Sequence, residues 1–180
     1  MRLVATPLAG AYVVELDLLG DERGWFARTY DEAVFAEHGL ERVGVQANSS
    51  FNAARDTLRG LHYQADPYGE AKLVRCVRGA IWDVGADLRP DSDTYLQWHA
   101  VELSADNRRG LYLPAGLAHG FQTLTTDCEV QYLMGHVHVP EAGRGVRWDD
   151  PAFAIDWPDP PAAGRTISER DSTYGPVAPG

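Results

Sequence analysis

The chain has 180 residues, of which 44% are hydrophobic and 23% charged, a composition typical of one folded domain with a full core rather than of a disordered protein. Its formal net charge of −10 argues against binding along a nucleic-acid backbone, which needs a basic face, although a few local cations suffice for one small anion. No run of about 18 apolar residues occurs and no signal-peptide core is present, so we expect no membrane span. Cys76 and Cys128 each lie in an apolar stretch, which favours a reduced, cytoplasmic protein.

The N-terminal part is expected to contain two strands and one short helix. Residues 11–18 are rich in β-branched and apolar side chains, and the turn-like segment 19–24 separates them from the aromatic stretch 25–30. Asp31 is a typical helix N-cap residue, and Gly39 is a typical helix end. The pattern therefore predicts two strands joined by a loop, followed by a helix between Asp31 and Gly39.

From residue 43 onward the pattern is that of short strands separated by Gly, Pro, Asn and Asp. The expected strands cover residues 43–48, 57–64, 72–77, 80–88, 95–103, 110–113, 120–124 and 128–134. Many short strands without intervening helices predict an all-β sandwich, jelly roll or barrel. Residues 159–180 are expected to form an irregular tail of the single domain 1–180.

The strand over residues 80–88 has the clearest alternation. It places Trp82, Val84 and Ala86 on one face, which we expect to be its core face. A tight-turn dipeptide, Arg-Gly, comes directly before it. Residues 72–88 are therefore expected to form a β-hairpin.

Residues 57–64, TLRGLHYQ, place a guanidinium, an imidazole, a phenol and an amide in one short extended run. In a regular strand Arg59 and His62 would point to opposite faces, but a β-bulge at Gly60 would bring them to the same face. A purely structural interpretation, a strand with one hydrogen-bonded histidine, stays open for this octapeptide alone.

A second motif, PAGLAHGF over residues 114–121, is a turn that leads His119 into a strand and has a form common in cupin-type jelly rolls. Many cupins hold a metal through an upstream HxH pair and this second motif. Here the HxH pair, His136 and His138, comes after the motif, and His62 stands in the upstream place. We therefore expect no metal site.

Three further residues have ordinary structural interpretations when each is taken alone. Tyr132 shares a strand face with apolar residues and fits a core position. Lys72 begins a strand, where an exposed lysine is common, and Asp171 lies in an expected loop. None of them indicates a functional site by itself.

Eight segments taken in order resemble the dTDP-4-dehydrorhamnose 3,5-epimerase family along nearly the whole chain. They are GDERGWF (20–26), VQAN (45–48), TLRGLHYQ (57–64), AKLVRCVRG (71–79), DLRPDSDTY (87–95), VELSADNRRGLYLPAGLAHGF (101–121), RGVRWDDPAFAIDWP (144–158) and ISERD (167–171). The resemblance implies a metal-independent cupin jelly roll that needs no cofactor and forms a homodimer. It also implies that the substrate is a nucleotide-diphosphate-linked 4-keto-6-deoxy sugar, epimerised beside its ketone.

Matched by position, the resemblance implies that His62 is the catalytic base and Asp171 its partner. It also implies that Lys72 lies near the ketone oxygen and that Tyr132 is the general acid. Removal of a proton beside a carbonyl requires such a set: a base, a positive donor at the oxygen, and an acid on the opposite face. The family's substrate-binding positions correspond to Arg23, Phe26, Arg28, Gln46, Asn48, Arg59, His119, His138 and Arg170.

Three departures from the family pattern concern the nucleotide end of the substrate. Arg28 replaces a glutamate of the rhamnose-pathway members, His138 replaces the aromatic residue that stacks on thymine, and Gly143 replaces an acid. Glutamate accepts the ring N–H of thymine, whereas arginine suits the ring acceptor of cytosine.

The sequence therefore predicts an epimerase acting on carbon 3, carbon 5 or both of a dTDP-4-keto-6-deoxy-hexose. The alternatives are an epimerase for a CDP-linked or other nucleotide sugar, a related ketoisomerase, and a non-catalytic cupin that binds a nucleotide sugar. The sequence leaves open the number of inverted carbons and the identity of the base.

Overall fold

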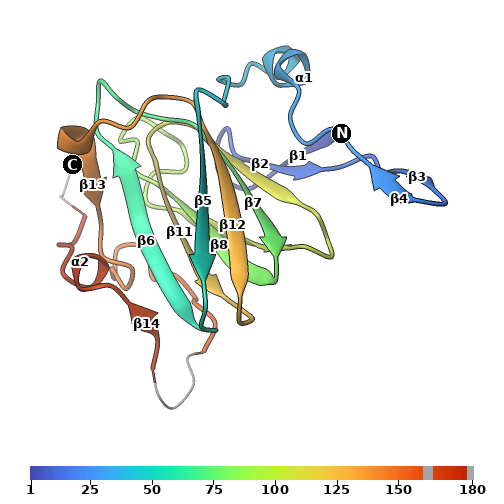
Figure 1. Cartoon of the computed structure of the whole chain (residues 1–180). Coiled ribbons are helices and arrows are strands. Elements are labelled where there is room, and N and C mark those ends of the chain that lie inside the picture. The colour runs from blue at the N-terminus through green and yellow to red at the C-terminus, as the bar shows by residue number, and fades with distance from the viewer. Residues whose placement is uncertain (160–163, 178–180) are drawn as a thin grey trace.

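Two sheets face each other in the computed structural model, which describes residues 1–159 and 164–177 (Figure 1). In spatial order, one sheet contains β1 (Arg2–Ala5), β2 (Tyr12–Glu15), β10 (Gly110–Leu113), β7 (Lys72–Arg78), β12 (Cys128–Met134) and β5 (Gln46–Asn52). The other contains β13 (Gly143–Gly145), β6 (Thr57–Gln64), β11 (Leu117–Thr123), β8 (Ala80–Asp87) and β9 (Trp98–Ser104), with β14 (Thr166–Ile167) parallel to β6. The expected all-β jelly roll is confirmed, and β6, β10 and β12 have the predicted bounds.

The N-terminal prediction is confirmed in part. The segment expected to be a turn lies within a hairpin of β3 (Leu19–Asp21) and β4 (Gly24–Phe26), which projects away from the sandwich (Figure 1). The helix α1 (Glu32–Glu37) follows as expected, because the Asp31 carboxylate accepts the Ala33 N–H at 3.1 Å. Gly39, with φ +70°, ends it.

The predicted hairpin of residues 72–88 is wrong. β7 pairs with β10 and β12 in one sheet, whereas β8 pairs with β9 and β11 in the other. The turn at Gly79 therefore leads the chain from one sheet to the facing sheet. A turn signal indicates a local reversal, but strand partners are chosen by contacts distant in sequence.

The expectation of a single core face on β8 is also wrong, because both faces are buried. Ile81 packs in the apolar cluster between the sheets. Val84 and Ala86 pack on the outer side against Phe153 and Trp157 of the C-terminal segment. The alternation along β8 is as predicted. The face that points between the sheets, however, is the one that carries Ile81 and the two aspartates of the strand, and the expected core face is the outer one.

The outer faces of both sheets are partly covered. α1 packs Phe35 against Tyr112 of β10, with ring centroids 5.4 Å apart. The expected irregular tail contains β14 and a short helix, α2 (Glu169–Ser172), in its described part, while residues 160–163 and 178–180 lie outside the described residues. A 3₁₀ turn, Pro140–Ala142, precedes β13. In the described ranges, no helix has the length and apolar character needed to cross a membrane.

Candidate active site

The β-bulge expected in β6 is present and turns two side chains to the same face. His119 of β11 lies opposite His62. Phe121, the second residue after His119 on β11, lies opposite Arg59, which is the third residue before His62 on β6. Between these two pairs β6 therefore has one residue more than β11. Gly60 at the bulge has φ +124°, and a Cβ there would lie 2.5 Å from a backbone Cα of β11, so only glycine fits. Arg59 and His62 consequently line one cavity.

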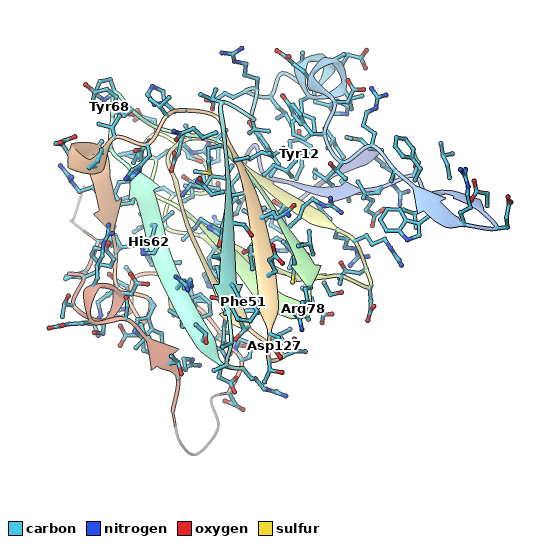
Figure 2. The ribbon with its side chains drawn as sticks, viewed as in Figure 1. Tyr12, Phe51, His62, Tyr68, Arg78 and Asp127 are labelled. Atoms are coloured by element: carbon cyan, nitrogen blue, oxygen red, sulfur yellow. The ribbon has the colours of Figure 1, made fainter. Side chains whose placement is uncertain are left out.

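The C-terminal segment carries Asp171 to His62, which is 109 residues away in the chain and projects from β6 (Figure 2). β14 runs beside β6, and Ser168 then caps α2 by accepting the Asp171 N–H at 3.1 Å. His62 Nε2 and Asp171 Oδ1 lie 2.7 Å apart, and the Gly60 N–H donates to the other carboxylate oxygen at 3.2 Å. Burial alone would raise the pKa of Asp171, but the hydrogen bond and charge of His62, together with the Gly60 N–H, outweigh it and lower that pKa. Because Nε2 faces the carboxylate, Nδ1 is the nitrogen of His62 left to take a proton.

A second histidine–aspartate pair lies on the neighbouring strands. His119 Nε2 of β11 and Asp83 Oδ1 of β8 lie 2.7 Å apart, with exposed side-chain fractions of 6% and 0%. Burial raises the pKa of Asp83, and the charges of His119 and Lys72 oppose this only in part. The His62 side chain, by contrast, is 38% exposed, so of the two histidines it is the one accessible to a ligand.

Lys72 begins β7 but is buried, with only 8% of its side chain exposed. Its Nζ donates to the backbone oxygen of His62 at 3.2 Å and lies 3.4 Å from Glu70 Oε1. Burial lowers the pKa of Lys72, while the charges of Glu70 and Asp83 act in the opposite direction. An ammonium group in this place is suited to stabilise negative charge on an oxygen of a bound ligand.

Tyr132 enters the same cavity from the facing sheet, on β12. Its hydroxyl lies 3.1 Å from Ser50 Oγ, and its ring packs edge-on against His119 with centroids 6.0 Å apart. Burial raises the pKa of Tyr132, and the hydrogen bond with Ser50 opposes this only in part. The phenol therefore keeps its proton at neutral pH, so an imidazole and a protonated phenol face the cavity from opposite sheets.

Two cavities that share His62 and Lys72 connect these groups. The first measures about 280 Å³, and the second, about 180 Å³, also reaches Arg144 and the tip of β13. Gln46 lies beside the second, where its Oε1 accepts the His138 N–H at 2.7 Å. The structure thus gathers ten of the predicted residues around the cavities: Gln46, Asn48, Arg59, His62, Lys72, His119, Tyr132, His138, Arg170 and Asp171.

Three predicted substrate contacts lie elsewhere. Arg23 and Phe26 are on the projecting β3–β4 hairpin, and Arg28 follows it (Figure 1). Arg23 forms an ion pair with Asp21, and Arg28 forms one with Asp31 at 2.8 Å. None of the three lines either cavity of its own chain, and their role stays a prediction.

Sequence reasoning missed the carboxylate partners of two site residues, Asp83 and Glu70. Asp83 alternates with Trp82, Val84 and Ala86, so the pattern places it on the face opposite the expected core face, and nothing in the pattern around Glu70 indicates burial. The composition does distinguish Lys72: it is the only lysine in the chain, and the other 15 basic residues are arginine. Within the ranges that the structure describes, no cluster of three or more His, Cys, Asp or Glu side chains is arranged to hold a metal ion.

Comparison with known proteins gives consistent matches along the chain. The family profile of dTDP-4-dehydrorhamnose 3,5-epimerase matches residues 5–178. The dTDP-4-dehydrorhamnose 3,5-epimerase of Methanothermobacter thermautotrophicus is 46% identical over 177 residues, which cover 98% of this chain and 94% of the relative.

Two solved structures are similar in sequence and in fold. The dTDP-4-dehydrorhamnose 3,5-epimerase of Bacillus anthracis, with TDP and pyrophosphate bound, superimposes with a TM-score of 0.91 at 37% identity, covering 98% of this chain and 99% of that one. ChmJ, a 3′-monoepimerase from Streptomyces bikiniensis in complex with dTDP-quinovose, gives a TM-score of 0.86 at 32% identity, covering 96% and 86%.

Proposed function

Because the chain belongs to the dTDP-4-dehydrorhamnose 3,5-epimerase family, we propose that it inverts carbon 3, carbon 5 or both of a dTDP-4-keto-6-deoxy-hexose in deoxysugar biosynthesis. The observation that carries this proposal is the placement of His62, with its partner Asp171, across one cavity from Tyr132. Inversion beside a ketone needs a base and an acid on opposite faces of the sugar and a positive donor at the ketone oxygen. His62 and Tyr132, on the two facing sheets, provide the base and the acid, and Lys72 provides the positive donor.

The reaction begins when Nδ1 of His62 takes the proton from the carbon beside the ketone. The electrons of that C–H bond form the double bond of an enolate, and its negative charge rests on the former ketone oxygen, to which the Lys72 ammonium donates. Asp171 holds the imidazole by Nε2 and stabilises the imidazolium. Tyr132 then donates its phenolic proton to the carbon from the other face, which restores the ketone with inverted configuration. Solvent returns a proton to Tyr132 and removes one from His62.

Arg59 and Arg170 line the two cavities and provide local positive charge in a chain of net charge −10. Arginine meets a diphosphate through bidentate, charge-assisted hydrogen bonds. The relatives with bound TDP or dTDP-quinovose support a thymidine nucleotide as the default, whereas Arg28 keeps a cytidine nucleotide as the alternative.

The proposed assembly is a homodimer. The β3–β4 hairpin exposes Leu19 at 67%, Trp25 at 49% and Phe26 at 67%, an apolar surface of the kind that contacts another protein. In a dimer the hairpin of one subunit would reach the cavity of the other, which reconciles the predicted roles of Arg23 and Arg28 with their distance from the cavity of their own chain. Light scattering should give a dimer for wild type and a monomer for Phe26→Asp, with a raised KM. A monomeric wild type with full activity would refute this assembly.

We propose a cytoplasmic location because both cysteines are reduced. Cys76 and Cys128 are both buried and free, and burial raises the pKa of the Cys76 thiol to about 12. Two buried thiols that form no disulfide suit a reducing compartment.

The decisive experiment is incubation with dTDP-4-keto-6-deoxyglucose in heavy water, with deuterium located by NMR and mass spectrometry. Label at carbons 3 and 5 indicates a double epimerase, and label at carbon 3 alone indicates a monoepimerase. A ketoisomerase would move the ketone and give a different product. If the protein binds the nucleotide sugar but no deuterium enters it, the protein is a binder and the enzymatic proposal fails.

A further inference from the structure

Lys72 shares its buried position with a carboxylate, and we propose that Glu70 is a positioning residue that keeps the Lys72 amine protonated and directed at the ketone oxygen. This inference deepens the proposed function and rests on it for the catalytic role of Lys72.

The contact between the two side chains is close and excluded from solvent. Glu70 Oε1 lies 3.4 Å from Lys72 Nζ, and each side chain is 8% exposed. In the described part of the chain, no other carboxylate lies within 4.0 Å of Nζ. Beside this ion pair, Nζ donates a hydrogen bond to the backbone oxygen of His62 at 3.2 Å, which fixes the amine beside the proposed base.

Gln64 holds Glu70 in this orientation. Its Nε2 donates to Glu70 Oε2 at 3.1 Å and to the Tyr68 oxygen at 3.0 Å, and its Oε1 accepts the Val139 N–H at 2.7 Å. Both carboxylate oxygens of Glu70 are thus occupied, one by the amide and one by the amine. The Gln64 amide, at the end of the TLRGLHYQ strand and two residues after His62, thus orients the Glu70 carboxylate.

The surroundings of Lys72 make the charge of Glu70 decisive. The other charged or titratable groups that line the two cavities are Arg59, His62 and Tyr63 of β6, His119 of β11, Tyr132 of β12, and His138, Arg144 and Arg170 of the C-terminal part. Asp83 of β8 lines neither cavity but acts on Lys72 through its charge. The arginines among them disfavour a further cation, and Asp83 is already paired with His119. Burial lowers the pKa of Lys72, and Glu70 provides the largest opposing effect. Without that charge the amine would lose its proton at lower pH and could not stabilise an enolate.

The chain permits a direct test, because Lys72 is its only lysine. Protein labelled with ¹³C-lysine therefore gives one lysine side-chain signal, whose titration reports this amine without any substrate. In Glu70→Gln, which keeps the shape and removes the charge, we expect the midpoint to fall by about one pH unit or more. Glu102→Gln, an exposed glutamate on β9, is the matched control and should keep the wild-type midpoint. An unchanged midpoint in Glu70→Gln overturns the proposal.

A second readout is the pH profile of deuterium exchange. The alkaline limb of kcat/KM should move to lower pH in Glu70→Gln, with rates near wild type on the acidic side, whereas a merely structural defect would lower the rate equally at every pH. Should Glu70→Gln fail to fold, Glu70→Ser is expected to show the same fall in the NMR midpoint, and a wild-type midpoint there also overturns the proposal. Absence of exchange in wild type would refute the proposed function and leave the NMR result to stand separately.

Discussion

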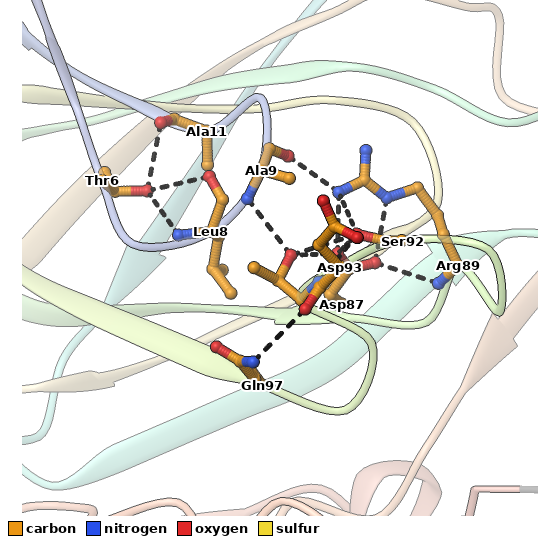
Figure 3. A network of polar contacts seen from close by, with 10 residues as sticks. Thr6, Leu8, Ala9, Ala11, Asp87, Arg89, Ser92, Asp93 and Gln97 are labelled. Carbon is orange, nitrogen blue, oxygen red and sulfur yellow. Dashed lines mark hydrogen bonds and ion pairs between the residues drawn. The ribbon is translucent and has the colours of Figure 1, made fainter.

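β8 uses a buried aspartate in opposite ways at the pocket, where Asp83 lies in the middle of the strand, and at the following loop, where Asp87 is its last residue. Asp83 and Asp87 are both 0% exposed and, four residues apart, lie on the same face of the strand. At the loop end, Asp87 accepts hydrogen bonds from Arg89 at 2.7 and 2.9 Å and from Ser92 and Thr94 at 2.6 Å each (Figure 3). At the pocket end, Asp83 meets His119 through one oxygen, and its Oδ2 has no hydrogen-bond partner in the described part of the chain.

The difference in hydrogen bonding gives the two carboxyl groups pKa shifts of opposite sign. Burial would raise the pKa of Asp87, but Arg89, Ser92 and Thr94 outweigh it and lower that pKa to about 2. For Asp83 burial prevails and raises the pKa. A buried polar group without partners is costly, so folded proteins satisfy almost all of them. Asp87 follows this rule, and its hydrogen bonds stabilise the fold. Asp83 departs from it, because one of its oxygens has no partner in the described part of the chain, beside the cavity where a ligand is proposed to bind.

Of the cavities at the loop and at the pocket, the larger one is not the proposed active site. A hollow of about 650 Å³ lies over the loop after β8, beside Arg89 and Asp93, and contains none of the predicted catalytic side chains. The cavity with His62 and Tyr132 is smaller, about 280 Å³. The chemical character of the lining residues, rather than the volume, distinguishes the two.

Replacement at the pocket end should affect turnover far more than stability, and His62→Asn should give the largest effect. Loss of a general base typically costs about 10² to 10⁴ in rate. Deuterium uptake at both carbons should fall by this factor, while the melting temperature and nucleotide binding stay near wild type. His38→Asn, at an exposed position after α1, is the control. Near-normal exchange in His62→Asn would show that the base lies elsewhere.

Tyr132→Phe should separate the two faces of the pocket. Without the phenolic proton, epimerised product should form about 10² more slowly. Exchange should fall less, because His62 still removes a proton and returns it to the same face. Product by NMR and deuterium by mass spectrometry, measured in one reaction, give the ratio. Equal losses would mean that Tyr132 only shapes the cavity.

Asp87→Asn should show the reverse pattern, with lost stability and unchanged turnover at 25 °C. The pKa of Asp87 is about 2 in the folded protein against 3.8 ordinarily, which corresponds to about 2 kcal/mol at neutral pH. Because the folded pKa is lowered, this contribution is complete above about pH 3.8 and is lost as the pH falls toward 2. Urea unfolding of wild type and variant should therefore differ at pH 7 and converge near pH 2. A constant difference across that range would contradict the electrostatic explanation.

Asp83→Asn makes the comparison within the same strand. The amide oxygen still accepts from His119, and a costly buried charge is removed, so the free energy of unfolding should change by less than about 1 kcal/mol. The weaker hold on His119 should raise KM by about tenfold or less with a smaller change in kcat. Steady-state kinetics and urea unfolding check both. A loss of stability equal to that of Asp87→Asn would mean that the two ends do not differ.

The smallest effect is expected at Arg28, outside both ends of β8. If the hairpin of one subunit completes the pocket of the other, Arg28→Glu should shift the order of nucleotide affinities toward dTDP and away from CDP, by about 1 kcal/mol. Calorimetric titration of dTDP, CDP, UDP and GDP against wild type and variant measures this order. If wild type clearly prefers dTDP and Arg28→Glu leaves the order unchanged, Arg28 does not contact the base.

The sequence by itself determined the features that depend on a few neighbouring residues. Alternation and turn residues predicted the bounds of β6, β10 and β12, and Asp31 with Gly39 marked the start and end of α1. Gly60 indicated the bulge that turns Arg59 and His62 to one face. These signals work because backbone conformation is set largely by local sterics and by hydrogen bonds within a few residues. The roles of the site residues came from resemblance to a family, not from local physics.

Only the tertiary structure decided which strand pairs with which, and which face of a strand is inside. The C-terminal segment covers the outer face of β8, so Asp83 points between the sheets although its neighbours in sequence suggest otherwise. It also brings Asp171 to His62 across 109 residues, and the closure of the sandwich buries Lys72 beside Glu70. Burial and partner choice depend on packing between segments distant in the chain, and no pattern within ten residues contains that information.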